Sequence, residues 1–410
     1  MLSDNYLRGG TTATVRTIMS LNPIFTLDTD NIFKYLAALK YCKISDRDSS
    51  SITVIAAKNF NLLISLSDGR NLLVKQEIHN DWGQSKGEFW SAWQIQKMLQ
   101  QFPDFGAKIE PFLPEILHFD PQNSILIVNY LTNYGDLYDY YAKSSLFPVE
   151  SAQAIGRLLG TIHGHTFQQS QYERFFNDPD LLARQQDLDR PWMADRTIRR
   201  LARITPQVLQ MVPPECWQFF RLYQRFPSLS QAIAELGETI TPSCLVHNDL
   251  KINNILLDLN WEQARSPVIR LIDWERASWG DPASDLGSIL GSYLELWLEG
   301  LIVSSSFSIN ESLQLATTPL ELIQPSLVAI VSSYLDSFSA ISTARPDAIE
   351  RAIQFAGLAL IQRIEGSVYE DRLFGNRQIM MLQVAKQLIC MPQAAMNTLF
   401  GDRAHQLVTK

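Results

Sequence analysis

Polar residues stand at fixed intervals ahead of two short apolar runs, and their types favour one kind of chemistry. His247, Asp249 and Asn254 lie in VHNDLKINNILLD, where a polar stretch runs directly into apolar residues 255–257. Asp273 follows 24 residues after Asp249, at the end of a second apolar run, VIRLID. Two short strands side by side, each delivering an acidic or amide side chain, form a small oxygen-rich site. Hard oxygen ligands without soft ones suit Mg²⁺ bound together with substrate phosphates.

Three motifs follow one another in this part of the chain: HNDLKINNILL, LIDWE and WGDPASDLG. They resemble the aminoglycoside and choline kinase branch of the protein-kinase-like fold. That family's pattern is a His-x-Asp loop with Asn five residues after the Asp, then Ile-Asp-Trp/Phe-Glu, then Gly-Asp-Pro-x-x-Asp-Leu. The resemblance extends over residues 30–400 and is sharp within 246–287.

The resemblance implies a role for each matching residue. Asp249 corresponds to the catalytic-loop aspartate, which accepts or orients the hydroxyl proton of the phosphate acceptor. Asn254 and Asp273 correspond to the metal-holding pair, and Lys251 to a lysine near the transferred phosphate. Two further residues would support the loop architecturally: His247 and Asp285. Taken singly, Asp and Asn beside strands are ordinary turn or cap residues, but their order and spacing together favour the catalytic interpretation.

A lysine and a glutamate in the first third of the chain match the residues with which the family binds the nucleotide phosphates. Lys75, in NLLVKQE, follows an Asp-Gly hairpin, where the resemblance implies a lysine in contact with the nucleotide phosphates. Glu88 comes thirteen residues later, in the place of the helix glutamate that pairs with that lysine. The alternative is a capping box from Ser85 to Glu88, in which Glu88 closes its own helix.

The phosphate loop departs from the family pattern. Residues 55–64, IAAKNFNLLI, contain no glycine, although a glycine-rich turn lets backbone amides approach phosphate closely. Lys58, Asn59 and Asn61 would have to substitute through side-chain charge and amide donors.

The arrangement of strand and helix signals predicts two lobes. Turn residues at 67–70 and 120–123 separate β-rich runs and predict two hairpins, with helices expected at 29–42 and 85–100. Helical periodicity dominates after residue 149. The resulting prediction is an α+β, bilobal, protein-kinase-like fold, with a small antiparallel-sheet N-lobe bearing one helix and a larger, mostly helical C-lobe.

The proposed lobe boundaries follow from the same change from a strand-rich to a helix-rich sequence. Residues 1–131 form the expected nucleotide-binding N-terminal lobe, and residues 132–410 the helical lobe with the catalytic loop and acceptor region. LIVNYL (126–131), which contains Asn129, would form the hinge beside the adenine and offer backbone donors and acceptors.

Composition and charge narrow the class of protein. The 46% hydrophobic and 19% charged residues are typical of a globular protein, and the net charge of −8 argues against a nucleic-acid binder. The four cysteines lack metal-ligand spacing, so a reducing compartment is expected. The first twenty residues lack a signal-peptide core, and no apolar run is long enough to span a membrane. A cytoplasmic protein with no membrane or nucleic-acid partner is therefore expected.

Four arginines share one face of a predicted helix in DRTIRRLARI, at i, i+3, i+4 and i+7: Arg196, Arg199, Arg200 and Arg203. One interpretation is a solvated surface. The other is part of an acceptor site. Either the aspartates at 187, 189 and 195 or an external anion must offset the charge, and an external anion implies an acidic acceptor or carrier. Such a face would repel polycationic aminoglycosides.

The leading hypothesis is an ATP- and Mg²⁺-dependent phosphotransferase acting on a hydroxyl of a small molecule. The alternatives are a kinase of Ser or Thr in a peptide during peptide natural-product maturation, and a kinase-like binding module without turnover. The sequence leaves the acceptor and the oligomeric state open.

Overall fold

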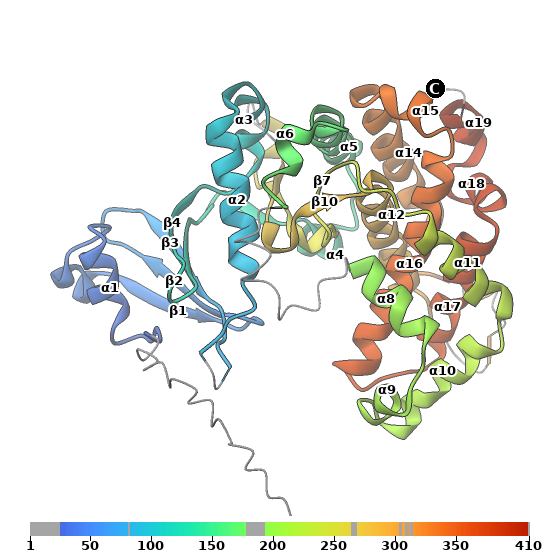
Figure 1. The fold of residues 1–410 in the computed structure, drawn as a ribbon, viewed down its shortest axis with the longest axis horizontal. Helices are drawn as coiled ribbons and strands as arrows, with labels where there is room; N and C mark the ends of the chain where they lie inside the picture. The colour runs from blue at the N-terminus through green and yellow to red at the C-terminus, as the bar shows by residue number, and fades with distance from the viewer. Residues whose placement is uncertain are drawn as a thin grey trace, which may run out of the picture.

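The computed structural model describes residues 25–80, 83–177, 193–263, 269–302, 306–307, 311 and 315–408. A strand-rich N-terminal part is followed by a larger, mostly helical part (Figure 1). The predicted α+β fold class, with an antiparallel sheet in the first lobe and helices in the second, is confirmed. The boundary at 131/132 remains a prediction. No helix of the described residues is both long enough and apolar enough to cross a membrane.

The strands form three antiparallel sheets. The large sheet has the order β1-β2-β3-β5-β4, and the smaller ones pair β6-β8-β9 and β7-β10. The strands are β1 (Ser51–Ile55), β2 (Phe60–Ser65), β3 (Asn71–Gln76), β4 (Ile116–Asp120), β5 (Ile125–Asn129), β6 (Tyr134–Asp136), β7 (Cys244–Val246), β8 (Ile255–Asp258), β9 (Ile269–Leu271) and β10 (Ser278–Gly280). Both predicted hairpins are confirmed, since β2 pairs with β3 and β4 with β5 across the expected turns.

The large sheet has two different faces because side chains alternate along each strand. On one face, apolar residues such as Leu62, Val74 and Ile127 are buried against α1 (Ile32–Ala38). On the other face, Asn61 of β2 lies directly across from Lys75 of β3. The sheet therefore presents these two polar residues side by side.

The first helix is shorter than predicted, ending at Ala38 where the sequence suggested 42. Lys40 has a φ of 66°, and the Tyr41 N–H donates to the Leu36 carbonyl. A left-handed residue followed by this bond is a helix-terminating motif, and apolar periodicity alone does not reveal it.

The other helices mostly build the second lobe. They are α2 (Glu88–Gln101), α3 (Pro103–Ile109), α4 (Leu137–Ser144), α5 (Val149–Thr166), α6 (Ser170–Glu173), α8 (Met193–Ala202), α9 (Pro206–Gln210), α10 (Trp217–Gln224), α11 (Pro227–Glu238), α12 (Pro282–Glu299), α14 (Leu320–Ser337), α15 (Ala340–Ala344), α16 (Ala348–Tyr369), α17 (Asn376–Cys390), α18 (Pro392–Phe400) and α19 (Ala404–Val408). Single 3₁₀ turns include η4 (Ile252–Asn254) and η6 (Trp274–Arg276).

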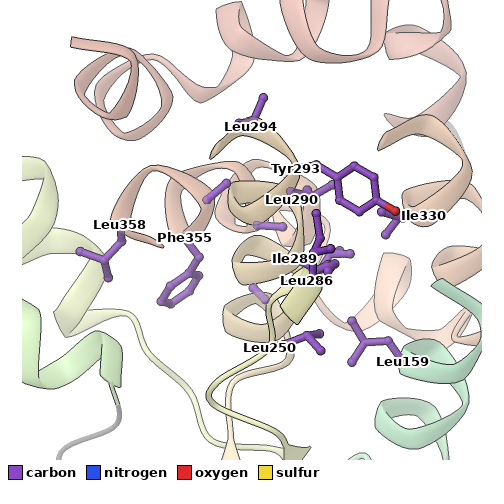
Figure 2. Close-up of a cluster of buried hydrophobic side chains, with 14 of the residues drawn as sticks. Leu159, Leu250, Leu286, Ile289, Leu290, Tyr293, Leu294, Ile330, Phe355 and Leu358 are labelled. Carbon is purple, nitrogen blue, oxygen red and sulfur yellow. The ribbon is translucent and has the colours of Figure 1, made fainter. Parts of the chain in front are cut away.

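Helix α12 runs through the centre of the helical lobe and packs closely on α16. A Cβ added to Gly287 of α12 would overlap the Ala352 carbonyl oxygen and the Phe355 side chain, so glycine permits this close approach. Figure 2 shows the apolar side chains gathered around α12, with Leu250 among them. Leu250 is 3% exposed, so the residue next to Asp249 is anchored in the core.

Candidate active site

The loop that carries Asp249 is held by one buried carboxylate. Asp285, in the first turn of α12, accepts the backbone N–H of His247 at 2.6 Å and that of Asn248 at 2.9 Å. Asn248 has a φ of 63°, a left-handed conformation that asparagine tolerates better than most residues. His163 Nε2 lies 3.4 Å from the same carboxylate. Burial opposes ionisation of Asp285, but His163 and the other donors outweigh it and lower the pKa.

Hydrogen bonds join the three sequence segments of the predicted site. The Nε2 of His247 lies 2.8 Å from the Ile272 carbonyl, and its Nδ1 accepts the Asp249 N–H at 3.3 Å. This network fits a neutral imidazole protonated on Nε2. Asn254 Nδ2 donates to the Asp249 carbonyl at 2.7 Å, and the Ile272 N–H donates to the Asn254 carbonyl at 2.9 Å. Asp249, Asn254 and the residue before Asp273 are therefore parts of one connected unit.

The Asp249 carboxylate lies between two cations. Arg276 Nη1 is 3.3 Å from Oδ1, and Lys251 Nζ is 3.6 Å from Oδ2. The Asp249 side chain is 20% exposed, so it remains accessible to a ligand. Arg276 was not predicted as a site residue, although it follows the quoted LIDWE motif directly. A carboxylate flanked by two cations can accept a proton while the cations face developing negative charge.

Asp273 meets the first lobe through Lys75. Its backbone is left-handed, with φ 61° and ψ 52°, two residues after the end of β9 and directly before η6. Lys75 Nζ donates to Asp273 Oδ1 at 2.8 Å and to Glu275 Oε1 at 2.6 Å. The Asp273 side chain is 42% exposed, whereas Lys75 and Glu275 are 12% and 14% exposed. A lysine of β3 is thus held by two carboxylates that lie about 200 residues further along the chain.

The charges of this cluster shift one another's pKa values. Burial disfavours the Lys75 ammonium, but attraction by Glu275 and Asp273 outweighs it and raises the pKa of Lys75. Burial also opposes ionisation of Asp273, yet Lys75 lowers the pKa of that carboxyl. For Glu275 burial prevails over Lys75, and the pKa is raised.

The expected ion pair between Lys75 and Glu88 does not form in the structure. Glu88 instead contacts Lys58 of the turn between β1 and β2, with Oε2 and Nζ 2.5 Å apart. The alternative, a capping box from Ser85, does not form either. The N-cap of α2 is Gly87, and the Glu77 carboxylate accepts the N–H groups of Gly87 and Glu88 at 3.1 and 2.7 Å.

The physical reason for the missing pair lies in η6. Helix α2 packs directly on Trp274–Arg276, which places the Glu275 carboxylate beside Lys75. Glu275 and Glu77 were not predicted as site residues, although both stand within motifs quoted from the sequence. Glu275 is the last residue of LIDWE, and Glu77 is the last residue of NLLVKQE, two residues after Lys75.

Two asparagines of the proposed nucleotide site have different surroundings. Asn61 is 7% exposed, and its Oδ1 has no hydrogen-bond partner among the described residues. Asn129 is already bonded to Glu115, through its backbone N–H at 2.9 Å and its side-chain amide at 3.1 Å. The Asn129 amide groups therefore require rearrangement before they can meet a base.

The predicted arginine face lies on α8, and one of its members is neutralised internally. Arg200 Nη1 lies 3.3 Å from Glu365 Oε1 on α16, and its guanidinium lies over the Tyr369 ring at 4.7 Å. Arg203 lines a cavity of about 650 Å³ between α8, α10 and α11. The side chains of the aspartates at 187, 189 and 195, suggested as compensating charges, lie outside the described residues. Arg196, Arg199 and Arg203 are exposed, and their contact with an acceptor remains a prediction.

The oxygen donors at the junction fit a magnesium ion carried by phosphates. The Nδ2 of Asn254 is used by the loop, which leaves its Oδ1 as an acceptor, and Asp273 offers a partly exposed carboxylate. No group of three or more His, Cys, Asp or Glu side chains suited to a metal exists within the described residues. Mg²⁺ is commonly bound by only one or two carboxylates together with substrate phosphates and water.

The chain belongs to the phosphotransferase enzyme family, whose sequence model matches residues 86–305, more than half of the chain. A 4-hydroxytryptamine kinase of Psilocybe cyanescens is 25% identical over 188 residues, 45% of this chain and 48% of that protein. The match therefore spans about half the length of this curated relative. The predicted resemblance to this family is confirmed.

Solved structures of kinases are also similar. A choline/ethanolamine kinase family protein from Mesorhizobium loti has 15% identity and a TM-score of 0.44, covering 93% of this chain and 99% of that one. The choline kinase LicA from Streptococcus pneumoniae has 13% identity and a TM-score of 0.46, covering 88% of this chain and 98% of its own.

Proposed function

We propose that this protein transfers the γ-phosphoryl group of ATP to a hydroxyl of a small molecule. The observation that carries the proposal is the hydrogen-bonded unit of Asp249, Asn254 and Ile272, the residue before Asp273, which His247 helps to join and Asp285 anchors. A purely structural role would not require the carboxylate of Asp273 to meet Lys75 of the other lobe beside this loop.

Asp249 would orient the acceptor hydroxyl and take its proton as the acceptor oxygen bonds to the γ-phosphorus and the bond to ADP breaks. Asn254 and Asp273 would hold Mg²⁺, which supplies charge neutralisation on the phosphates when bound. Lys75 would contact the same phosphates. Arg276 and Lys251, beside Asp249, would face the negative charge of the transferred group.

The acceptor is proposed at the level of a hydroxyl-bearing small molecule. The named relatives act on, or are named for, small molecules such as 4-hydroxytryptamine and choline. The peptide alternative rested on the arginine face, and Arg200 already has Glu365 as its partner. All four cysteines are free, which fits the reducing, ATP-containing cytoplasm that we propose as its location.

The test is a product assay on the purified protein. ATP with Mg²⁺ should raise the melting temperature more than ATP with a chelator, because ligand binding to the native state stabilises it. A panel of choline-like, hydroxyindole and aminoglycoside alcohols should contain at least one compound that gains a phosphoryl group by mass spectrometry while ADP forms. Nucleotide binding without turnover on any acceptor would favour the binding module, and turnover on Ser or Thr peptides alone would favour the peptide kinase.

A further inference from the structure

Two lysines and two glutamates at the lobe junction are paired differently from the arrangement that the family pattern implies. Lys75 is bonded to Glu275 at 2.6 Å, and Lys58 to Glu88 at 2.5 Å. Glu88 thus pairs with Lys58 of the β1–β2 turn, and Glu275 pairs with Lys75 of β3.

The Lys75–Glu275 pair is built into the packing between the lobes. Both side chains are largely buried, and the Lys75 ammonium lies 5.8 Å from the ring centre of Phe89 on α2. Lys75 also bonds Asp273, the carboxylate proposed for the metal. If Asp273 held a metal ion, Glu275 would remain as the carboxylate that fixes the Lys75 ammonium.

The Lys58–Glu88 pair lies at the turn that has no glycine. Lys58 is 47% exposed and Glu88 15% exposed. The ammonium end of the pair is therefore the half that solvent reaches, and solvent screening reduces what such a pair contributes to stability. An ammonium held by one carboxylate and otherwise open to solvent is in a position to bind an anion.

Asn61 provides an independent observation at the same place. It lies directly across from Lys75 in the sheet, is 7% exposed, and has a buried Oδ1 without a partner among the described residues. A buried amide oxygen without a donor is unfavourable, so nothing in the described residues fixes the orientation of this amide. Its amide can rotate to donate to a phosphate oxygen.

We propose that side chains replace the glycine-rich backbone at the phosphate end of the nucleotide site: Lys58, positioned by Glu88, and Asn61 bind phosphate beside Lys75, which Glu275 positions. This inference rests on the proposed ATP-dependent function and goes beyond it by reassigning Glu88 and Glu275. Lys58 and Asn61 contact the nucleotide, whereas the two glutamates act through the lysines.

The experiment is a set of double-mutant cycles read by calorimetric binding of ATP and AMP. Lys58→Met should weaken ATP binding about tenfold, the loss expected for one charge-assisted contact, and leave AMP binding within about twofold. Glu88→Gln should weaken ATP binding alone but have no further effect in the Lys58→Met background. Glu275→Gln and Lys75→Met should be coupled in the same way, whereas Glu88→Gln and Lys75→Met should be additive.

Two variants separate binding from folding. Asn61→Leu removes the amide at nearly constant volume and should weaken ATP binding while the melting temperature is unchanged or higher, because an unsatisfied buried group is lost. Lys86→Met removes a nearby exposed lysine next to α2 and should change neither quantity.

The failures of the two proposals are distinguishable. Coupling between Lys75 and Glu88, or equal losses of ATP and AMP affinity in Lys58→Met, would overturn the reassignment while leaving the kinase proposal intact. A wild-type protein that binds no ATP would overturn both.

Discussion

Asp285→Asn should damage the catalytic loop without touching any group proposed to meet substrate. The carboxylate is 1% exposed and accepts two consecutive backbone N–H bonds, from His247 and Asn248. Each hydrogen bond to a charged group contributes about 1.5–3 kcal/mol. Asparagine keeps one acceptor oxygen and turns an NH₂ toward the second N–H, so the free energy of unfolding should fall by about 2–4 kcal/mol.

The consequences can be measured as a melting temperature and a rate. With an unfolding entropy of about 2.1 cal/mol/K per residue, this loss corresponds to a decrease of about 2–5 °C. The displaced loop should lower kcat by about 10- to 100-fold, because misplacement by about 1 Å is enough for such a loss. The KM for ATP should change little, since Lys75 and Asp273 are not bonded to Asp285 in the structure.

A matched control is Asp281, the N-cap residue of α12. Asp281 is also buried, but it accepts from the Thr241 and Ala283 N–H groups and pairs with Arg351 at 2.7 Å. Asp281→Asn should lower the melting temperature and keep kcat at 25 °C within about twofold, because the Asp249 loop retains its anchor. Equal kcat values for the two variants would refute the anchoring role of Asp285.

The pH dependence of the Asp285 effect has a defined sign. Folding lowers the pKa of Asp285, so its contribution to stability is present above the unfolded-state value of about 3.9 and is lost as the pH falls through the folded value. The difference in melting temperature between wild type and Asp285→Asn should therefore be largest near neutral pH and shrink below about pH 4.

Further predictions concern the metal, the arginine face and Glu295 of α12. Asp273→Ala should abolish the effect of Mg²⁺ on the calorimetric affinity for ATP; an unchanged effect would mean that the metal is held elsewhere. Arg200→Glu should lower the free energy of unfolding by about 2–4 kcal/mol in denaturant titration, because Glu365 loses its partner, and adding Glu365→Arg should restore part of it. Burial, opposed by Arg363, raises the pKa of Glu295 to about 7. Since this raised pKa reduces stability as the pH rises from about 4.3 to about 7, Glu295→Gln should raise the melting temperature more at pH 8 than at pH 5, and an equal shift at both would contradict the assignment.

Features encoded by neighbouring residues could be predicted from the sequence. The Asp-Gly turn at residues 68–69 and the alternating apolar residues around it are enough to predict the β2–β3 hairpin and the place of Lys75. The order of Asp249, Asn254 and Asp273 along two short apolar runs predicted that the segments carrying them would lie together, because β8, which follows Asn254, pairs with β9, which precedes Asp273.

Pairings between distant residues could not be predicted in the same way. Lys75 and Glu275 are 200 positions apart, and their contact depends on how α2 packs on η6. Arg200 and Glu365 are 165 positions apart on different helices. Charge and spacing identify such residues as candidates, but packing between elements decides which carboxylate reaches which cation.

The most direct test of the proposed phosphotransfer mechanism is the Asp249→Asn variant, assayed for both nucleotide binding and phosphoryl transfer. We expect an ATP affinity within about threefold of wild type and a transfer rate lower by about 10²- to 10⁴-fold, because the acceptor hydroxyl loses its proton acceptor while the phosphate site stays intact. Transfer at a near-normal rate would contradict the assignment of Asp249 and with it the proposed mechanism.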